Sequence, residues 1–402
     1  MTELISVVEA DARIAQRTPR FGTVQVPLDQ AAGRILRQTV VAGHDHPPFD
    51  RVMMDGIAIR WSESVPRALS VTGTQLAGMT GGTLGTINEA CIEVATGAML
   101  PSGSDCVIPI EQTWQDGSRY LLTDDCRPMH KQFIHPRGAD CLAGSLLLEE
   151  GVRLGAPEMA LLASNGITQV RVAATPSIAI LSTGDELLPV DAPILGEGLI
   201  RRSNDIAIAT ALRMHGLDRV VCEHVDDDFE ATKAALARLL NAHDALILSG
   251  GVSKGKRDHV PAALEALGVQ RVFHRIAQRP GKPMWFGIGP GRQMVFALPG
   301  NPVSALVCAV RYARPTLLVA QGVSMPPPMQ VVLAGAVDTS ESLTCFVPAA
   351  LQSDAEGRQM ADLVPARTSG DFTALPHTHG VVELPAMAGQ LPAGSVVIFH
   401  RW

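Results

Sequence analysis

The chain has 402 residues, of which 46% are hydrophobic and 18% charged, so it is long enough for two or three domains with a sizeable core. Its formal net charge of −7 argues against a general nucleic-acid binder and leaves room only for a local basic pocket. The acidic, amphipathic start and the lack of a long apolar run predict a cytoplasmic protein without a membrane segment. Seven widely spaced cysteines with no C-x-x-C predict reduced thiols rather than a disulfide framework or a zinc site.

Residues 45–140 are rich in Gly, Thr and short β-like runs without a strong helical pattern, which predicts a β-rich domain. Two His-x-His pairs, His44/His46 and His377/His379, would need further ligands from the fold to hold a metal. Loop positions are the favoured interpretation of both pairs.

Residues 177–325 alternate predicted strands and helices. The runs "SIAILS" (177–182), "RVVCEHV" (219–225) and "DALILS" (244–249) are typical of buried strands. Between them lie two helical segments, the first capped by Ser203 or Asn204 and stopped by Gly216. This β-α-β-α order predicts an α/β domain with a mostly parallel, doubly wound sheet covered on both faces.

Ligands of such sheets bind beyond the carboxyl ends of the strands. The segments "STGDEL", "DDD", "SGGVSKGKRD" and "RPGKP" each follow a predicted strand, so we expect them to meet at one edge. Three acidic side chains there, Glu186, Asp227 and Asp258, would repel one another without a cation, and they suit Mg²⁺ on phosphate oxygens. The residues alone favour a helix cap at Asp227 about as much as a metal ligand.

The third of these segments comes close to a phosphate-binding loop. Gly250, Gly255 and Lys256 have the required spacing, but Arg257 occupies the position of the Ser or Thr that binds Mg²⁺. The loop also follows the third strand of its domain rather than the first, so we interpret the match as fortuitous. Gly250 and Gly251 still let the backbone approach a ligand and bind phosphate oxygens.

Residues 326–402 follow the linker "MPPPM" and alternate like the strands of a small barrel. The fold class predicted for the whole chain is therefore α/β plus β, in several domains, ending in a small β-barrel.

Long stretches of the chain resemble the MoeA family of molybdopterin molybdenumtransferases, which includes the E domain of gephyrin. They are "PPFDRVMMDGIAI", "ATGAMLPSGSDCVIPIE", "LSTGDELLPV", "SNDIAIATALRMHG", "SGGVSKGKRDHV", "QRPGKPMWFG" and "ALPGNPVSAL", in the family's order. The resemblance covers nearly the whole chain.

The resemblance implies a dimeric enzyme that takes adenylylated molybdopterin and molybdate, releases AMP and is assisted by Mg²⁺. It implies four domains: residues 1–44 with 141–176, 45–140, 177–325 and 326–402. The helix "APEMALLASNGI" is then expected to pack beside "VVEADARIAQ". Implied partners are the molybdopterin adenylyltransferase and maturation factors of molybdoenzymes, with no nucleic acid or membrane.

The resemblance also assigns roles to individual residues. Metal-binding and catalytic roles fall on Glu186, Asp227 and Asp258, with Asp55 and Thr96 reaching the site from the β-rich domain. Contacts to substrate and nucleotide fall on Thr183, Gly184, Ser249, Gly250, Gly251 and Ser253. Oxyanion binding falls on Arg275, Arg279, Lys282 and Ser304, with Pro299 and Pro302 stiffening the last loop. Ordinary turn chemistry is the competing interpretation of Asp55 and Thr96, since each precedes a glycine.

Several positions depart from the family pattern. Arg51-Val52 replaces Asn-Ser, His135 and Ala139 replace an Arg and a Glu, Arg202 replaces an Asp, and Arg275 and Arg279 stand where Lys is common. Pro348 stands where a functional Arg is frequent, so one cation is lost. These departures keep a second hypothesis open, that of a non-catalytic cofactor-binding or scaffold paralogue. The sequence does not distinguish molybdate from tungstate.

Overall fold

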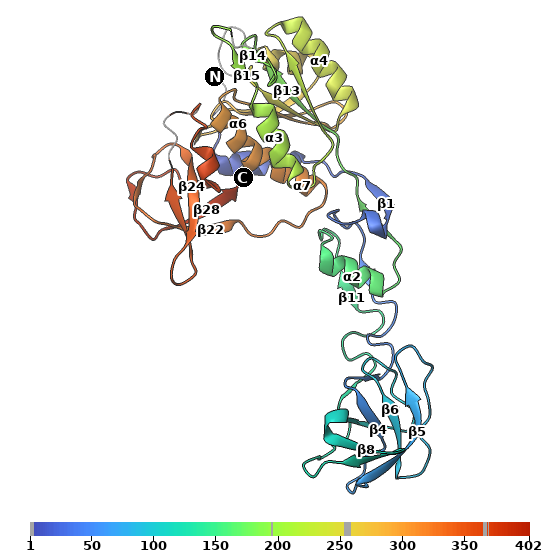
Figure 1. The fold of residues 1–402 in the computed structure, drawn as a ribbon. Coiled ribbons are helices and arrows are strands. Elements are labelled where there is room, and N and C mark those ends of the chain that lie inside the picture. The colour runs from blue at the N-terminus through green and yellow to red at the C-terminus, as the bar shows by residue number, and fades with distance from the viewer. Residues whose placement is uncertain (1–3, 194–195, 253–258, 365–367, 369) are drawn as a thin grey trace. The chain divides into compact units, whose positions relative to one another are not determined.

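The computed structural model describes residues 4–193, 196–252, 259–364, 368 and 370–402, and its ribbon is drawn in Figure 1. The chain divides into two compact units, one of Met1–Arg37, Glu150–Gly155 and Gln169–Trp402, the other of Gln38–Glu149 and Ala156–Thr168. Each unit is described by itself below. The predicted boundaries of the four domains stay predictions.

The first unit is built on a six-stranded sheet in the order β16-β13-β17-β21-β20-β18. The first four strands are mutually parallel, and β20 is antiparallel to both of its neighbours, β21 and β18, which confirms the predicted mostly parallel sheet. The strands are β13 (Ile178–Thr183), β16 (Val220–Val225), β17 (Ala245–Ser249), β18 (Gln270–His274), β20 (Trp285–Ile288) and β21 (Met294–Leu298).

Helices cover both faces of this sheet, because its strands are apolar on both sides. They are α1 (Val7–Arg17), α3 (Asn204–Arg213), α4 (Phe229–Ala242), α5 (Val260–Ala266), α6 (Pro302–Cys308) and α7 (Arg314–Ala320). Along β13, Ile178 and Ile180 join a core with α1, α3, α6 and α7. Ala179 and Leu181 join a second core with α4 and α5.

The helix α1 packs onto the α/β sheet of the first unit, and its predicted contact with the 156–167 helix of the second unit stays a prediction. Ser6 caps its start by accepting the N–H of Glu9, and Val7, Ala10 and Ile14 are buried in the first core of the α/β sheet. Tertiary packing onto the sheet therefore decides where this amphipathic helix lies, which its own pattern could not indicate.

The run Pro302–Ala320 is long and apolar enough to cross a membrane by composition, but 78% of its most apolar window is buried inside the protein. It comprises α6, a short π-helix at Ala309–Ala313 and α7. This run is a core helix of the α/β sheet.

The C-terminal residues form a closed five-stranded barrel, as predicted. Its strands follow the order β24-β25-β22-β28-β26, and β26 pairs back onto β24. They are β22 (Met329–Leu333), β24 (Thr344–Ser353), β25 (Gln359–Leu363), β26 (Gly380–Leu384) and β28 (Val396–Arg401). A two-residue strand, β19 (Gln278–Arg279), extends the barrel sheet by pairing with β24. The α/β sheet and the barrel are thereby joined through the backbone.

Short pairs and turns complete the first unit. They are β1 (Thr23–Pro27) with β12 (Gln169–Ala173), β14 (Leu187–Leu188) with β15 (Ile200–Arg201), β23 (Val337–Asp338) with β27 (Gln390–Leu391), and 3-10 turns at Leu28–Gln30 and Leu375–His377.

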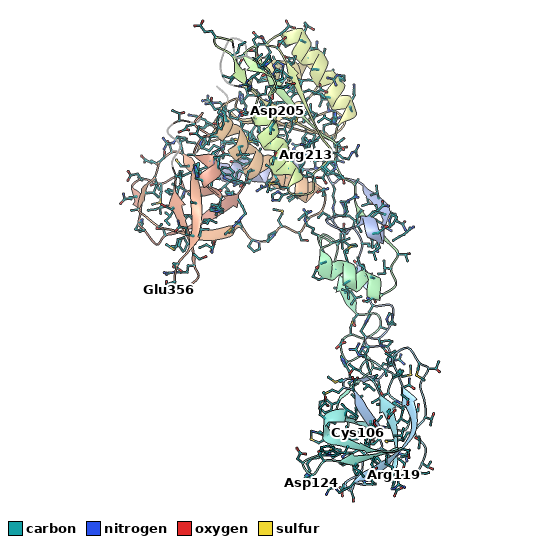
Figure 2. All side chains as sticks on the ribbon, in the orientation of Figure 1. Cys106, Arg119, Asp124, Asp205, Arg213 and Glu356 are labelled. Carbon is teal, nitrogen blue, oxygen red and sulfur yellow. The ribbon has the colours of Figure 1, made fainter. Side chains whose placement is uncertain are left out.

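The second unit is β-rich, as predicted, with a six-stranded sheet in the order β7-β4-β6-β5-β9-β8. Its strands are β4 (Gly56–Ile59), β5 (Ala68–Gln75), β6 (Ala90–Val94), β7 (Cys106–Pro109), β8 (Thr113–Asp116) and β9 (Arg119–Leu122), with a 3-10 turn at Ile110–Gln112. Cys106 lies in its core, whereas Arg119 is exposed (Figure 2). The unit also holds β2 (Val40–Val41) paired with β11 (Leu146–Leu148), β3 (Arg51–Val52) paired with β10 (Ile134–His135), and α2 (Ala156–Ser164).

Candidate functional site

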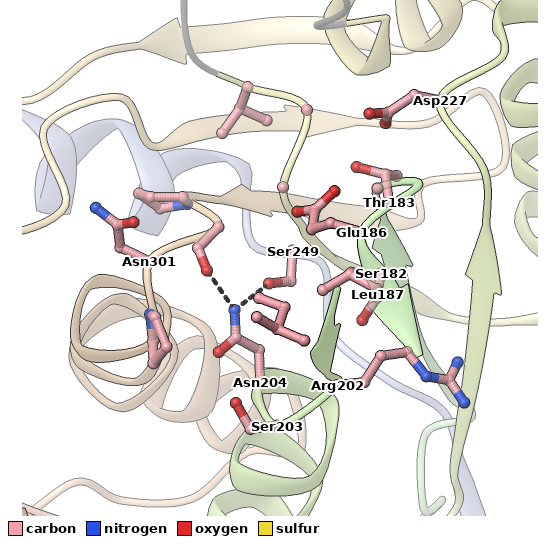
Figure 3. A pocket seen from close by; sticks show the side chains of 18 of the residues that line it. Ser182, Thr183, Glu186, Leu187, Arg202, Ser203, Asn204, Asp227, Ser249 and Asn301 are labelled. Carbon is pink, nitrogen blue, oxygen red and sulfur yellow. Dashed lines mark hydrogen bonds between the residues drawn. The ribbon is translucent and has the colours of Figure 1, made fainter. Parts of the chain in front are cut away.

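A cavity of about 650 Å³ lies at the carboxyl edge of the parallel strands (Figure 3). The segment after β13 contributes Thr183, Gly184 and Glu186, and Asp227 follows β16. The segment after β17 contributes Ser249, Gly250 and Gly251, and the segment after β21 contributes Pro299, Gly300, Asn301 and Pro302. The structure thus brings together residues of three of the strand-end segments that the sequence placed at one edge. The fourth, "RPGKP", contributes only Pro283 to this cavity, and the segment after β21 was not among those predicted.

Glycine is required where the first and third of these loops meet. Gly250 has φ +100°, and a Cβ there would lie 2.8 Å from the carbonyl oxygen of Thr183 and 2.9 Å from its Oγ1. A side chain at this position would therefore force β13 and β17 apart at their ends. The bare backbone instead forms the floor of the cavity.

Asn204 also lines the cavity, at a position that the sequence analysis considered only as a helix cap. Ser203 precedes α3 at the cap position without making a side-chain hydrogen bond to the helix. The Asn204 Nδ2 instead donates to Ser249 Oγ at 2.8 Å and to the carbonyl oxygen of Gly300 at 2.7 Å (Figure 3). One amide thus fixes the loops after β17 and β21. The sequence held one indication of this second role: Ser203 and Asn204 are both good helix caps, and the helix needs only one.

Asp227 and Asp228, in the acidic run after β16, have different roles. Asp228 caps α4, since its carboxylate accepts the N–H of Ala231 at 2.7 Å. Asp227 donates its backbone N–H to Asp185 Oδ1 at 2.9 Å, and its side chain lines the cavity. The helix-cap interpretation of Asp227 is therefore wrong, because its neighbour fills that position.

Magnesium fits the donor set at this edge of the sheet. The carboxylates of Glu186 and Asp227 line one cavity, and the buried Thr183 Oγ1 has no hydrogen-bond partner among the described residues. Carboxylate and hydroxyl oxygens are the ligands that Mg²⁺ prefers. Asp258, the third predicted ligand, and Ser253 lie outside the described residues. Within the described ranges, no group of three or more His, Cys, Asp or Glu side chains is placed to hold a metal.

A second cavity, of about 660 Å³, adjoins the first and shares Pro283, Pro299 and Asn301 with it. Its lining includes Arg279, Lys282 and Ser304 from the α/β domain and Pro348 from β24 of the barrel. Arg279 is exposed, Lys282 half-buried and Ser304 only 3% exposed. The two cations thus lie beside the carboxylate-lined cavity, across a wall that both cavities share.

Arg275 was grouped with these cations by its sequence position, but it lines neither cavity. Its φ of +83° turns the chain sharply, and its backbone N–H donates to the carbonyl oxygen of Met284. Arg202, in contrast, does line the first cavity; its buried Nε makes no hydrogen bond to a described residue and lies 4.0 Å from Asp205 Oδ2. Pro348 lines the second cavity, so the departure from the family pattern falls on the wall of the predicted oxyanion site.

Asp55 and Thr96 belong to the second unit, where they contact each other. The backbone N–H of Thr96 donates to Asp55 Oδ1 at 2.6 Å. This hydrogen bond, aided by the Thr96 side chain, lowers the pKa of Asp55 below its usual value. The structure therefore holds Asp55 as a carboxylate.

Two departures from the family pattern contact each other in the second unit. Arg51 and His135 are direct partners in the β3–β10 pair. Arg51 donates to His135 Nδ1 at 3.1 Å, and His135 Nε2 lies 2.8 Å from Asp140 Oδ1. A guanidinium from the neighbouring strand thus lies against position 135, where the family pattern has an Arg. Ala139, in the same loop, donates its backbone N–H to the carbonyl oxygen of Pro136.

The two His-x-His pairs make ordinary local contacts. The rings of His44 and His46 lie 4.5 Å apart, and His46 Nε2 lies 3.1 Å from Asn165 Oδ1. His379 Nδ1 accepts the backbone N–H of Leu351. These contacts agree with loop roles for both pairs.

Comparison with known proteins identifies the family. Residues 5–166 match the MoeA N-terminal region, domains I and II, and residues 179–318 match the family described as a probable molybdopterin binding domain. A molybdopterin molybdenumtransferase of Synechocystis sp. is 35% identical over 403 residues, which cover 99% of this chain and 100% of that protein. The chain belongs to the MoeA family.

Other MoeA relatives agree with this. A molybdopterin molybdenumtransferase of Synechococcus elongatus is 33% identical over 93% of each chain. The crystal structure of a molybdopterin biosynthesis MoeA protein from Pyrococcus horikoshii superposes with a TM-score of 0.80 at 29% identity, covering 99% of both chains. The predicted fold class of this MoeA chain, α/β plus β with a C-terminal barrel, is confirmed.

Proposed function

We propose that this MoeA-family protein inserts molybdenum from molybdate into adenylylated molybdopterin and releases AMP. The observation that carries the proposal is the shared wall of Pro283, Pro299 and Asn301. On one side lie glycine-rich loops and carboxylates, and on the other lie Arg279 and Lys282. A substrate whose phosphates occupy the first cavity would place its pterin end beside an oxyanion held in the second.

The residues of the first cavity hold the nucleotide end of the substrate. The loop of Ser249, Gly250 and Gly251 offers backbone N–H groups and a hydroxyl to phosphate oxygens. Glu186 and Asp227, with Asp258, would hold Mg²⁺, which neutralises charge on the pyrophosphate whose P–O bond breaks. The two hydrogen bonds from Asn204 hold the loops after β17 and β21 in place around the pyrophosphate.

The residues of the second cavity hold molybdate, which is a substrate. Arg279 offers a planar fork of N–H donors to two oxygens of the dianion, and Lys282 adds a point charge. Ser304 can donate its hydroxyl from the buried wall. Asp55 and Thr96 of the second unit, by the resemblance, complete the site in the dimer.

The setting of this function is part of the proposal. We place the protein in the cytoplasm as a homodimer that acts on small molecules rather than on nucleic acid or membranes. Its substrate would come from a molybdopterin adenylyltransferase, and its product would pass to maturation factors of molybdoenzymes.

The deciding experiment measures AMP released when purified protein receives adenylylated molybdopterin, Mg²⁺ and molybdate. We expect AMP only when all three are present, and omission of molybdate or addition of a chelator should each abolish it. A parallel series with tungstate shows which oxyanion the protein selects.

A second function, non-catalytic cofactor binding, is favoured by one observation. Pro348 lines the oxyanion cavity where the family pattern has an Arg, so one charge is lost from it. Tight binding of adenylylated molybdopterin without AMP release in the same assay would establish this alternative and exclude the transferase.

A further inference from the structure

A fully buried polar network lies directly beneath the turn that carries Arg279 and Lys282. Gln278 is 0% exposed and Tyr312 is 1% exposed. The Tyr312 hydroxyl donates to Gln278 Oε1, and Gln278 Nε2 donates to the carbonyl oxygen of Pro280 at 3.0 Å. The side chain of one buried amide therefore joins the π-helix to the middle of the turn.

The turn closes over this network without free space. Gly281 has φ +93°, and a Cβ at this residue would collide with Cys308 Sγ and Gln278 Nε2. Gln278 Nε2 also lies 3.6 Å from Cys308 Sγ. The backbone of the turn thus rests on Gln278, and only glycine permits this approach.

The helix beneath the turn has an unusual shape at the point of contact. Ala309–Ala313, which includes Tyr312, forms a π-helix between α6 and α7. Pro315 lacks an N–H to bond the carbonyl of Arg311, which favours a wider turn before it. Such single-turn π-helices are uncommon and occur frequently at functional sites.

The network has a fixed direction. Burial raises the pKa of Tyr312 well above its usual value of 10.0, so the phenol stays protonated and donates. Because its hydroxyl occupies Gln278 Oε1, the amide NH₂ must point toward Pro280. Burying polar side chains costs free energy that hydrogen bonds must offset. If this contact served only packing, apolar side chains would stabilise the fold at lower cost.

We propose that Tyr312 and Gln278 are positioning residues that hold the Arg279–Lys282 turn in its oxyanion-binding shape. The start of the turn is paired with the barrel at β19, and the network fixes the carbonyl of Pro280 in its middle. Both cations are thereby preorganised, so little chain freedom is lost when an anion binds. This inference rests on the proposed function only in naming molybdate as the anion.

The test compares variants that separate positioning from stability. Tyr312→Phe removes the hydroxyl and leaves Gln278 Oε1 unpaired, so both the melting temperature and molybdate affinity should fall. The double variant Gln278→Met/Tyr312→Phe makes the contact apolar, which should restore most of the melting temperature. It still lacks the bond to Pro280, so the dissociation constant for molybdate should stay about three- to tenfold above wild type. Thr316→Val is the matched control, because its buried hydroxyl donates to the carbonyl oxygen of Tyr312 on the same helical run and not to Gln278 or the turn.

Hydrogen exchange of the ligand-free protein gives a readout that needs no substrate. The backbone amides of the peptide spanning 276–284 should exchange about threefold faster in both network variants than in wild type. Their exchange rate should be unchanged in the Thr316→Val control. Unchanged exchange, or recovery of molybdate affinity together with stability in the double variant, would overturn the positioning role. If wild type fails to bind molybdate but exchange responds as expected, the proposed function fails and the positioning role stands.

Discussion

At the scale of single residues, the site depends on which of two neighbouring aspartates faces the helix. Asp228 takes the cap of α4, and this leaves Asp227 on the cavity wall. Both are acidic and adjacent, so their different roles come from backbone geometry rather than chemistry. Substitutions at these two aspartates can therefore be compared directly, since we expect neither to change the fold.

Asp227→Asn should lower the rate of AMP release by about 10²-fold while leaving nucleotide affinity within a few-fold of wild type. Charge builds on the departing phosphate in the transition state, so a lost metal ligand matters most there. Asp228→Asn is the control, since Asn caps helices as well as Asp. AMP-release kinetics and calorimetric nucleotide titration measure both quantities. Equal losses of binding and turnover in Asp227→Asn would contradict the metal-binding role.

Arg279→Ala should weaken molybdate binding by about one to two orders of magnitude, the weight of a charge-assisted hydrogen bond. Arg279→Lys should recover only part of this, because a point charge replaces a fork. Nucleotide affinity without molybdate should stay nearly constant. Arg275→Ala carries the same loss of charge four residues away but outside the cavity, so it should bind molybdate normally. Calorimetry at fixed salt tests the series, and wild-type affinity in Arg279→Ala would place the anion elsewhere.

At the scale of elements, one arginine ties three of them together. Arg311 of the π-helix contacts Asp11 of α1 at 2.7 Å and Glu383 of β26 at 3.0 Å, and its side chain is 13% exposed. His400 of β28 lies 2.7 Å from the same Glu383. Burial opposes ionisation of Glu383, but the His400 hydrogen bond and the Arg311 charge outweigh it, so its pKa is lowered.

Glu383→Gln should therefore reduce the free energy of unfolding at neutral pH by about 3 kcal/mol, as for other broken buried pairs. Because the folded pKa lies below the ordinary 4.5, the contribution of Glu383 is present above that value and is lost as pH falls through the folded pKa. The variant should thus lose less stability than wild type on acidification. Urea unfolding from pH 7 to 3 measures this, with Glu356→Gln, a 68% exposed ion-pair partner, as control. Parallel pH curves for wild type and Glu383→Gln would refute the coupling.

Sequence reasoning succeeded where the deciding contacts are local or follow from topology. The strand-end loops met as predicted because parallel strands place their carboxyl ends at one edge. Asn204 and the Gln278–Tyr312 pair escaped it, since their partners are 34 to 96 residues away and no local pattern marks them. Nothing in the sequence indicated that Arg275 lines neither cavity, since no local pattern marks its left-handed backbone conformation.

At the scale of the whole molecule, α2 suggests a partner for the second unit. Its sequence "APEMALLAS" is mostly apolar, yet Leu162 is the only residue that it buries. An apolar helix normally buries a face, so another surface should cover it. This supports the homodimer already proposed on other grounds.

Light scattering at micromolar concentration should therefore give a mass of about twice 42.6 kDa. Apolar burial at such an interface should make the mass insensitive to moderate salt. A mass near 42.6 kDa at this concentration would contradict the homodimer and, with it, a site completed by Asp55 and Thr96 of a second chain.

The wall of Pro283, Pro299 and Asn301 has a thermodynamic consequence for the order of events. A ligand that shifts this wall from one side changes the free energy of binding on the other side. By reciprocity, any factor by which molybdate changes the affinity for AMP is the factor by which AMP changes the affinity for molybdate. Pro283 and Pro299 fix the backbone φ angles of the wall, so a displacement on one side is less easily absorbed by local changes of the backbone. Under the proposed function, departure of AMP from one cavity would therefore be linked to the binding of molybdate in the other.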